Sequence, residues 1–155
     1  SEAATSKKIG RSKKTVRTKY RECRTEQGVL CTVPDLMEFA AELQGIAPIE
    51  KTAFGCLGDP AFAQALATSG RRQLLLTGIE AHICVMQTAL LAIEQGFNVF
   101  IPRDAVGSRI EREYEAGLDR LDRAGAELVT TEMAMFEMLR EAGTPEFKRT
   151  LPMLK

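Results

Sequence analysis

The sequence predicts an α/β fold in which helices cover both faces of a parallel sheet. Segments with the pattern of strands alternate with segments with the pattern of helices from residue 47 to the last residue, which is typical of parallel sheets. Residues 73–77 (QLLLT) are almost continuously apolar, as expected of a strand covered on both faces. At 155 residues, 45% hydrophobic and 27% charged, the chain has the size and balance of one globular domain.

Periodicity and capping residues predict the first elements. Residues 33–43 place apolar side chains at helical spacing behind a proline suited to a first helical turn. Residues 47–50 form a short apolar segment that predicts a strand. Residues 60–68 predict a helix, because Asp59 is suited to its N-cap and Gly70 follows its end.

The second half of the chain continues the alternation. Residues 83–95 are apolar nearly all round, so we expect a buried helix there and not a surface one. Residues 110–124 place apolar and charged side chains on different sides, as an ordinary amphipathic helix does. The remaining predicted elements are strands at 98–101 and 127–129, a helix at 132–141 capped by Thr131, and a surface-packed tail at 145–155.

A change of charge divides the chain near residue 24. Residues 1–24 hold nine Lys and Arg against two Glu, a net charge of +7, whereas the remainder carries a net charge of −7. The first segment has few large apolar side chains and cannot bury enough surface to offset its ordering entropy. We therefore predict a basic, disordered or non-native segment at 1–24 and one folded domain at 25–155. Its charge would attract nucleic acid, but Tyr20 is its single aromatic side chain and offers little base stacking, so nucleic-acid binding is not expected.

Composition excludes several classes of protein. The sequence has no apolar run of about 18 residues, so no transmembrane helix or membrane partner is expected, and its charged start lacks the apolar core of a secretory signal. Four irregularly spaced cysteines and a single histidine do not form a local zinc site. No phosphate-loop or dinucleotide motif is present. We therefore expect no metal, no cofactor, reduced thiols and a cytoplasmic protein.

Cys84 is the candidate nucleophile. In a parallel sheet the chemistry lies beyond the carboxyl ends of the strands, where this sequence places the loops 51–54, 78–84 and 102–109. Cys84 lies just inside the start of the predicted buried helix, where free N–H groups and the helix dipole favour a thiolate. The same N–H groups could hold an oxyanion. The alternative is that Cys84 is a small apolar filler, and its position alone does not decide between the two.

Lys51 is the candidate basic partner of that thiol. It follows the strand predicted at 47–50, so its ammonium group could reach the same edge of the sheet. There it could hold the thiolate as an ion pair or assist proton transfer. A surface lysine at the edge of a loop is the alternative interpretation.

Three further residues are candidates for the wall of a pocket. Phe54 and His82 belong to two of the three loops. His82 lies only two residues from Cys84, so its side chain would not easily reach the sulfur, and a pocket wall is favoured over a Cys–His dyad. Asp104 follows the strand predicted at 98–101 and either caps a turn or lines the pocket; the capping role is favoured.

One long run resembles a known family. Residues 74–109, LLLTGIEAHICVMQTALLAIEQGFNVFIPRDAVGSR, resemble the signature of the isochorismatase-like cysteine hydrolases. The segments TVPDL (32–36) and IEKTAFGC (49–56) resemble the region that precedes it, and the resemblance covers residues 25–155. The form GIEAHICV is similar to that of an uncharacterised branch of the superfamily. The resemblance implies a Rossmann-type, three-layer α/β fold.

The resemblance also implies a site. It assigns Cys84 as the nucleophile and Lys51 as its basic partner. It implies a non-proline cis peptide bond between Ile79 and Glu80, which in the family turns the N–H groups of Glu80 and Cys84 toward the oxyanion. The histidine cluster that binds metal in nicotinamidases has no counterpart, since His82 is the single histidine.

The N-terminal part departs from the family pattern. The family begins with an apolar strand of the form L-L-V-I-D-M-Q, whose aspartate completes an Asp–Lys–Cys triad. Nothing in residues 1–24 resembles that strand, so the first strand of the fold has no counterpart there. Three explanations fit: a shifted frame or truncation that damages the enzyme, a replacement in a non-catalytic paralogue, or a strand supplied by a partner chain. The abrupt change of charge near Arg24 favours the first.

These features lead to two expected functions. The first is a hydrolase of a small amide, or less often a vinyl ether, that forms a thioester on Cys84 and is weak or inactive because the triad aspartate is not matched. The alternative is a non-catalytic interaction protein whose basic segment contacts nucleic acid or a partner. The expected partners are a small-molecule substrate and, from the family resemblance, further copies of the chain in a homo-oligomer.

Overall fold

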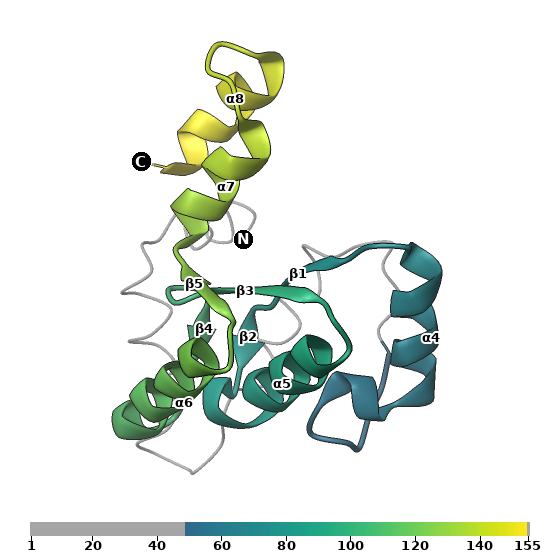
Figure 1. Ribbon diagram of the computed structural model, residues 1–155. Helices are drawn as coiled ribbons and strands as arrows, with labels where there is room; N and C mark the ends of the chain where they lie inside the picture. Colours follow the sequence, from purple (N-terminus) through teal and green to yellow (C-terminus); the bar gives the residue numbers. More distant parts are fainter. Residues whose placement is uncertain (1–48, 155) are drawn as a thin grey trace, which may run out of the picture. The chain divides into compact units, whose positions relative to one another are not determined.

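The computed structural model of the chain describes residues 49–154 (Figure 1). The predictions for residues 1–24 and 33–43 therefore lie outside the described residues. The chain divides into two compact units, of which one is Ile46–Thr130 and the other includes Thr131–Lys155. The candidate residues Lys51 to Asp104 all belong to the first unit.

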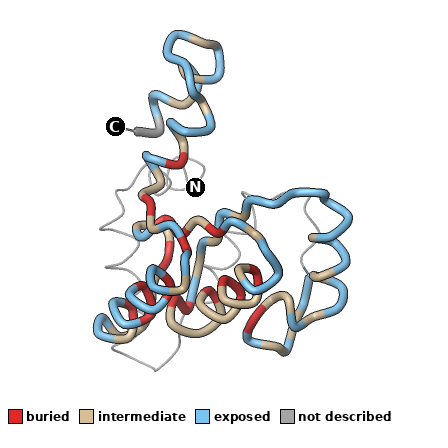
Figure 2. Tube along the Cα trace, viewed as in Figure 1, coloured by how far each residue is buried: buried red, intermediate tan, exposed pale blue. Residues whose placement is uncertain are grey.

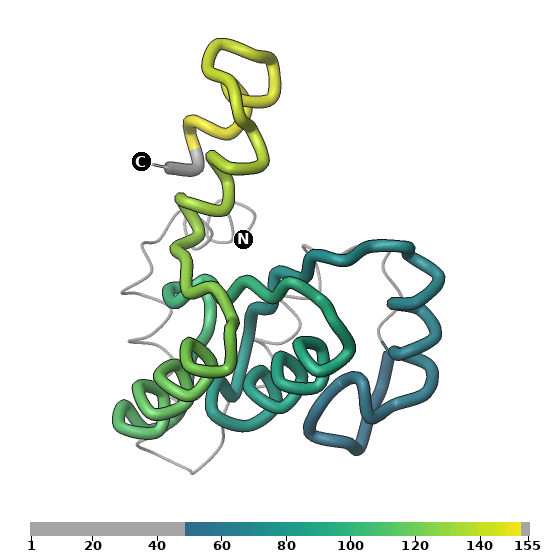
Figure 3. Tube along the Cα trace, in the orientation of Figure 1, coloured from purple at the N-terminus to yellow at the C-terminus, as the bar shows by residue number. Residues whose placement is uncertain are grey.

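Parallel strands form the centre of the first unit. Strands β1 (Gln73–Leu75), β3 (Asn98–Pro102) and β5 (Glu127–Val129) form one sheet in the order β1-β3-β5, with every pair parallel. A second parallel pair joins β2 (Gly78–Ile79) to β4 (Val106–Gly107). Figure 3 traces the chain from β1 through β2 into the helix that follows. The predicted α/β class with a parallel sheet is confirmed.

The helix predicted at 60–68 is confirmed as α4 (Pro60–Ser69), which follows the short 3-10 turn η1 (Cys56–Gly58). The Asp59 carboxylate accepts hydrogen bonds from the N–H groups of Ala61 and Phe62, as an N-cap does. Gly70 ends the helix with φ 65°, a left-handed conformation that favours glycine.

The helix predicted at 83–95 starts earlier and is not uniform. It begins as a π-helical turn, η2 (Ala81–Val85), and continues as α5 (Met86–Glu94). In the wider turn the Val85 N–H donates to the Glu80 carbonyl, five residues back, at 3.1 Å. The amphipathic helix predicted at 110–124 is α6 (Glu111–Arg123).

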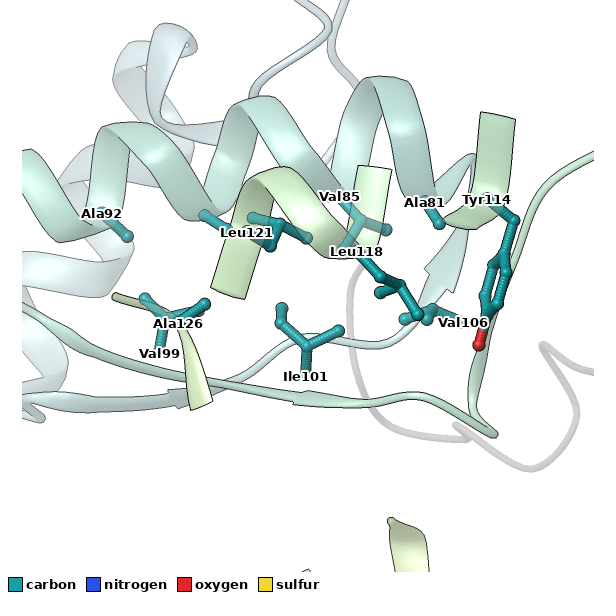
Figure 4. Close-up of a cluster of buried hydrophobic side chains, with 11 residues drawn as sticks. Ala81, Val85, Ala92, Val99, Ile101, Val106, Tyr114, Leu118, Leu121 and Ala126 are labelled. Carbon is teal, nitrogen blue, oxygen red and sulfur yellow. The ribbon is translucent and has the colours of Figure 1, made fainter. Parts of the chain in front are cut away.

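The core lies between one face of the three-stranded sheet and the helices η2, α5 and α6 (Figures 1 and 2). Val99 and Ile101 on β3 point from the sheet into the cluster that these helices form (Figure 4). The hydroxyl of Tyr114 on α6 donates to the Arg103 carbonyl just after β3. The alternating burial of β3 follows from the alternation of side chains along a strand.

Two strand predictions need correction. The strand predicted at 73–77 ends at Leu75, whose side chain is 46% exposed and not covered on its face. Leu75 points away from the face on which α5 and α6 pack, because side chains alternate along the strand. The described end of the strand predicted at 47–50 is not a strand, since residues 49 and 50 pair with none of the described strands.

The described part of the other unit is helical. It holds α7 (Thr131–Leu139), α8 (Pro145–Thr150) and the 3-10 turn η3 (Leu151–Leu154). The helix predicted at 132–141 ends two residues early, since Arg140 takes a positive φ of 60°. The rings of Phe136 and Phe147 pack with centroids 6.2 Å apart, and most other residues of the predicted tail are exposed.

Candidate active site

Two of the three predicted loops lie side by side. The parallel pairing of β2 with β4 brings residues 78–84 next to residues 102–109. The N–H of Gly78 donates to the Ala105 carbonyl at 2.9 Å and extends this pairing. Asp104 is half-buried in the turn between β3 and β4, where the Ala105 N–H donates to the Pro102 carbonyl at 2.8 Å.

Cys84 is a half-buried free thiol on the π-helical turn η2. Its neighbours Ala81 and Val85 are 0% and 6% exposed, so the turn is anchored in the core. The peptide bond between Ile79 and Glu80, just before the turn, is cis, which is the geometry that the family resemblance implies. Ile79 is 38% exposed whereas Glu80 is 4% exposed.

The side chain of Glu80 forms a buried polar cluster that the sequence did not predict. Its Oε2 accepts a hydrogen bond from the Arg109 N–H at 3.1 Å and lies 3.4 Å from Nδ1 of His82. The same His82 nitrogen lies 2.9 Å from the Ser108 hydroxyl. Gly117 on α6 lies directly against His82, where a Cβ would approach its Cα to 2.9 Å. His82 therefore holds the turn to the loop after β4, and its side chain is 14% exposed.

Lys51 makes its described hydrogen bonds within its own loop. Its ammonium group donates to the Ala53 carbonyl at 2.8 Å and to the Phe54 carbonyl at 3.0 Å. These two bonds curl the loop around the lysine. The side chain of Phe54 in the same loop is 62% exposed. They do not join Lys51 to Cys84 directly.

A threonine joins the Lys51 loop, which comprises residues 51–56, to the Cys84 turn, which is η2. The Thr88 hydroxyl on α5 donates to the Cys84 carbonyl at 2.6 Å and accepts from the Cys56 N–H at 2.9 Å. Thr88 escaped the sequence analysis because a threonine within an apolar helix resembles an ordinary core residue. The one signal that could have identified it is its position four residues after Cys84, on the same side of the helix.

Residues 49–154 contain no cluster of metal ligands and no helix suited to span a membrane. No three His, Cys, Asp or Glu side chains of that range come together as metal ligands would. None of the helices within the same range combines the length and apolar character needed to cross a membrane.

Comparisons with known proteins agree on one family. The profile of the isochorismatase domain matches residues 21–133. Isochorismatase domain-containing protein 2 of Bos taurus is 36% identical over 130 residues, which cover 83% of this chain and 60% of that protein. This chain thus spans about 60% of the length of the curated relatives that it matches first.

Solved structures of similar fold include two that are called YcaC. The YcaC gene product from Escherichia coli, an octameric hydrolase of unknown specificity, has a TM-score of 0.63 and 28% identity, and the match covers 80% of this chain and 57% of that one. YcaC from Pseudomonas aeruginosa, with hexane-2,5-diol and covalent acrylamide, has a TM-score of 0.67 and 25% identity, with 83% and 63% covered. Similarity to an octamer is consistent with a homo-oligomer.

Proposed function

This chain belongs to the isochorismatase domain family, and we propose that it carries the site of a cysteine hydrolase that acts on a small amide. The observation that carries the proposal is the hydrogen-bonded link through Thr88, which ties the loop of Lys51 to the turn of Cys84. The two residues that the resemblance assigns to catalysis thereby belong to one connected substructure.

The proposed reaction proceeds through a thioester. The Cys84 thiolate attacks the amide carbonyl carbon, and the carbonyl π electrons move to oxygen to give an oxyanion. The backbone N–H groups of Glu80 and Cys84 hold that oxyanion. Collapse of the intermediate breaks the C–N bond and releases the amine, which takes up a proton. Water then attacks the thioester, releases the carboxylic acid and restores the thiol.

Lys51 is the proposed proton carrier of this reaction. An ammonium group has three N–H donors, and the bonds to the Ala53 and Phe54 carbonyls use two of them. The third can be directed to the thiolate or to the departing nitrogen. A positive charge beside a thiol favours its thiolate form.

A similar protein supports a reactive nucleophile in this fold. Its structure contains covalent acrylamide, and acrylamide is an electrophile that nucleophiles such as thiolates capture. Cys84 is the free thiol of this chain that lies on the turn before α5. Phe54, His82 and Asp104 remain the pocket walls that we propose from the sequence.

The proposal is tested by the reactivity of the thiols and by turnover. The alkylation rate of each cysteine is measured by mass spectrometry between about pH 5 and 9. A free thiol titrates near pH 8.5, and at pH values below this Cys84 should react faster than Cys56. Cys56 is a suitable reference because it is also free and half-buried. Hydrolysis of a panel of small amides should disappear in Cys84→Ala and persist in Cys56→Ala. Equal reactivity of the two thiols, with no turnover, would remove the proposal.

The organisation of the chain is part of the proposal. We propose a folded domain at 25–155 that assembles with copies of itself in the cytoplasm, supported by the octameric relative and the free thiols of Cys56 and Cys84. Light scattering should give a multiple of the chain mass, whereas a monomer at all concentrations would contradict the assembly. Binding to nucleic acid that is lost at high salt and on removal of residues 1–24 would favour the interaction protein instead.

A further inference from the structure

Thr88 uses its hydroxyl group to join two segments that are distant in sequence. The side chain lies on α5 and the residue is 3% exposed. Its Oγ1 donates to the Cys84 carbonyl at 2.6 Å and accepts from the Cys56 N–H at 2.9 Å. A hydroxyl has one proton to donate, and here that proton goes to the residue that carries the proposed nucleophile.

A second threonine shows what an ordinary helical threonine does. Thr68 on α4 donates to the carbonyl four residues back, that of Gln64, at 2.8 Å. Its second hydrogen-bond partner is the Gln64 side chain, so both bonds stay within one helix, and the residue is exposed. Bonds to the carbonyl four residues back are common for threonine in helices. Thr88 differs because it is buried and because it also holds the backbone of another segment.

The loop of Lys51 also touches the same helix at the neighbouring residue. A Cβ added to Gly55 would lie 2.9 Å from Cδ1 of Leu91 and 3.2 Å from the backbone carbon of Gln87. Gly55 is buried. The backbone of the loop therefore rests directly on α5 at Gly55 and is hydrogen-bonded to it at Cys56.

The position of Lys51 follows from this contact. Its ammonium group is bonded to the carbonyls of Ala53 and Phe54, and Phe54 is adjacent to Gly55. The lysine is thus fixed to the loop, and the loop is fixed to Thr88. The other bond of the same hydroxyl fixes the backbone of Cys84.

We infer that Thr88 is a positioning residue that sets the place of Lys51 relative to Cys84 and thereby the pH at which Cys84 reacts. The inference rests on the proposed function, in which the lysine charge favours the thiolate. If the loop moves away from α5, that charge acts on the sulfur over a longer distance and favours the thiolate less.

The first test is the pair Thr88→Val and Thr88→Ser in the full chain. Valine has nearly the shape of threonine but has no hydroxyl, whereas serine keeps the hydroxyl. In Thr88→Val, alkylation of Cys84 by iodoacetamide at pH 7 should slow by about tenfold, which equals a shift of about one pH unit. Thr88→Ser should stay within about twofold of the unchanged chain, because both hydrogen bonds remain.

Matched controls separate positioning from a loss of folding. Thr68→Val removes the same kind of bond from an exposed position on α4. It should leave unchanged the Cys84 profile, which is the dependence of the Cys84 alkylation rate on pH. Unfolding would expose Cys56 together with Cys84 and would raise the alkylation rate of Cys56. Unfolding would also raise the alkylation rate of Cys84, whereas loss of positioning lowers it, so slower alkylation of Cys84 is the expected result for a positioning residue.

A second variant covers the case in which Thr88→Val does not fold. Gly55→Ala leaves the hydroxyl in place and inserts a methyl group between the loop and α5. It should shift the Cys84 profile in the same direction as Thr88→Val and to a smaller extent. A Cys84 profile that is unchanged in every folded variant overturns the inference and leaves the proposed function intact.

Hydrogen exchange separates the inference from the proposed function. If Cys84 of the unchanged chain reacts like a free thiol, the proposed function fails. The hydrogen-bonded connection through Thr88 is then tested by the hydrogen exchange rates of the amides in residues 53–58. Thr88→Val should accelerate exchange there, since the Cys56 N–H loses its acceptor, while Thr88→Ser should not. Equal exchange in both variants overturns the positioning role of Thr88.

Discussion

The Cys84 turn and the Lys51 loop, the two parts of the proposed site, are held in place by different means. The turn is flanked by Ala81 and Val85, which are 0% and 6% exposed and belong to the core. The loop carries Phe54, which is 62% exposed, and it is joined to α5 through the hydrogen bond between Cys56 and Thr88. The turn is held by core packing, whereas the loop is held by contacts with α5. Substitutions in the core should therefore change stability, and substitutions in the loop should change the reactivity of Cys84.

Truncation of the core beneath the turn should have the largest effect on stability. Ile101 is 0% exposed and packs in the cluster below η2 and α5 (Figure 4). Ile101→Ala should lower the free energy of unfolding by about 3 kcal/mol, because it removes buried methyl groups and leaves a cavity. Urea denaturation measures the change. Phe54→Ala in the loop should change it by less than about 0.5 kcal/mol, and equal losses would contradict the comparison.

Overpacking against the turn should have the next largest effect. Gly117→Ala would place a methyl group 2.9 Å from the Cα of His82. Because the obstacle is backbone, the helix or the turn must shift, and we expect a loss of about 2 kcal/mol in the free energy of unfolding. Asp119→Ala, an exposed change on the same helix, serves as the control in the same urea titration. Gain of stability in Gly117→Ala would show that the turn yields easily.

Loss of the buried carboxylate should have a smaller effect. Glu80→Gln keeps an oxygen that can accept from the Arg109 N–H but replaces the other acceptor oxygen by an amide donor. We expect a loss of about 1 kcal/mol, the scale of one hydrogen bond. Glu127→Gln changes an exposed position on β5 and should leave the free energy of unfolding unchanged in the same urea experiment. Indistinguishable stabilities would mean that the Glu80 cluster does not hold the turn.

Replacement of the lysine should have the smallest effect on stability and a clear effect on chemistry. Lys51→Met keeps the length of the side chain and removes its charge. The free energy of unfolding should change by less than about 0.5 kcal/mol. Alkylation of Cys84 at pH 7 should slow by more than the roughly tenfold expected for Thr88→Val, because the charge is removed and not only displaced. Lys148→Met, exposed on α8, is the matched control. An unchanged alkylation rate of Cys84 would show that the Lys51 charge does not act on the thiol.

Local signals explain why several elements could be predicted. The bounds of α4 follow from Asp59 and Gly70, and the long polar and apolar sides of 110–124 identify α6. The outcome at 73–77 was different. Whether Leu75 is covered depends on which face of the sheet the described helices occupy. The sequence of a single strand does not indicate which face that is.

The candidate site shows the same division. Cys84 and Lys51 were singled out from their expected places at a helix start and a strand end, and the family resemblance added the Ile79–Glu80 bond. The partners that connect them lie 32 residues apart for Cys56 and Thr88 and 29 residues apart for Arg109 and Glu80. Cys56 and Thr88 belong to different segments of the family resemblance, and although Glu80 and Arg109 belong to the same long run, nothing in its pattern shows that they are in contact.

The sequence by itself determined the alternation of strands and helices, the caps of α4 and the family to which the chain belongs. The tertiary structure alone decided that Thr88 bridges two segments, that Glu80 is buried against Arg109, and that Leu75 is exposed. The physical reason is range. Caps and periodicity depend on residues within one or two turns, whereas these contacts arise only when distant segments pack and their buried polar groups must find partners.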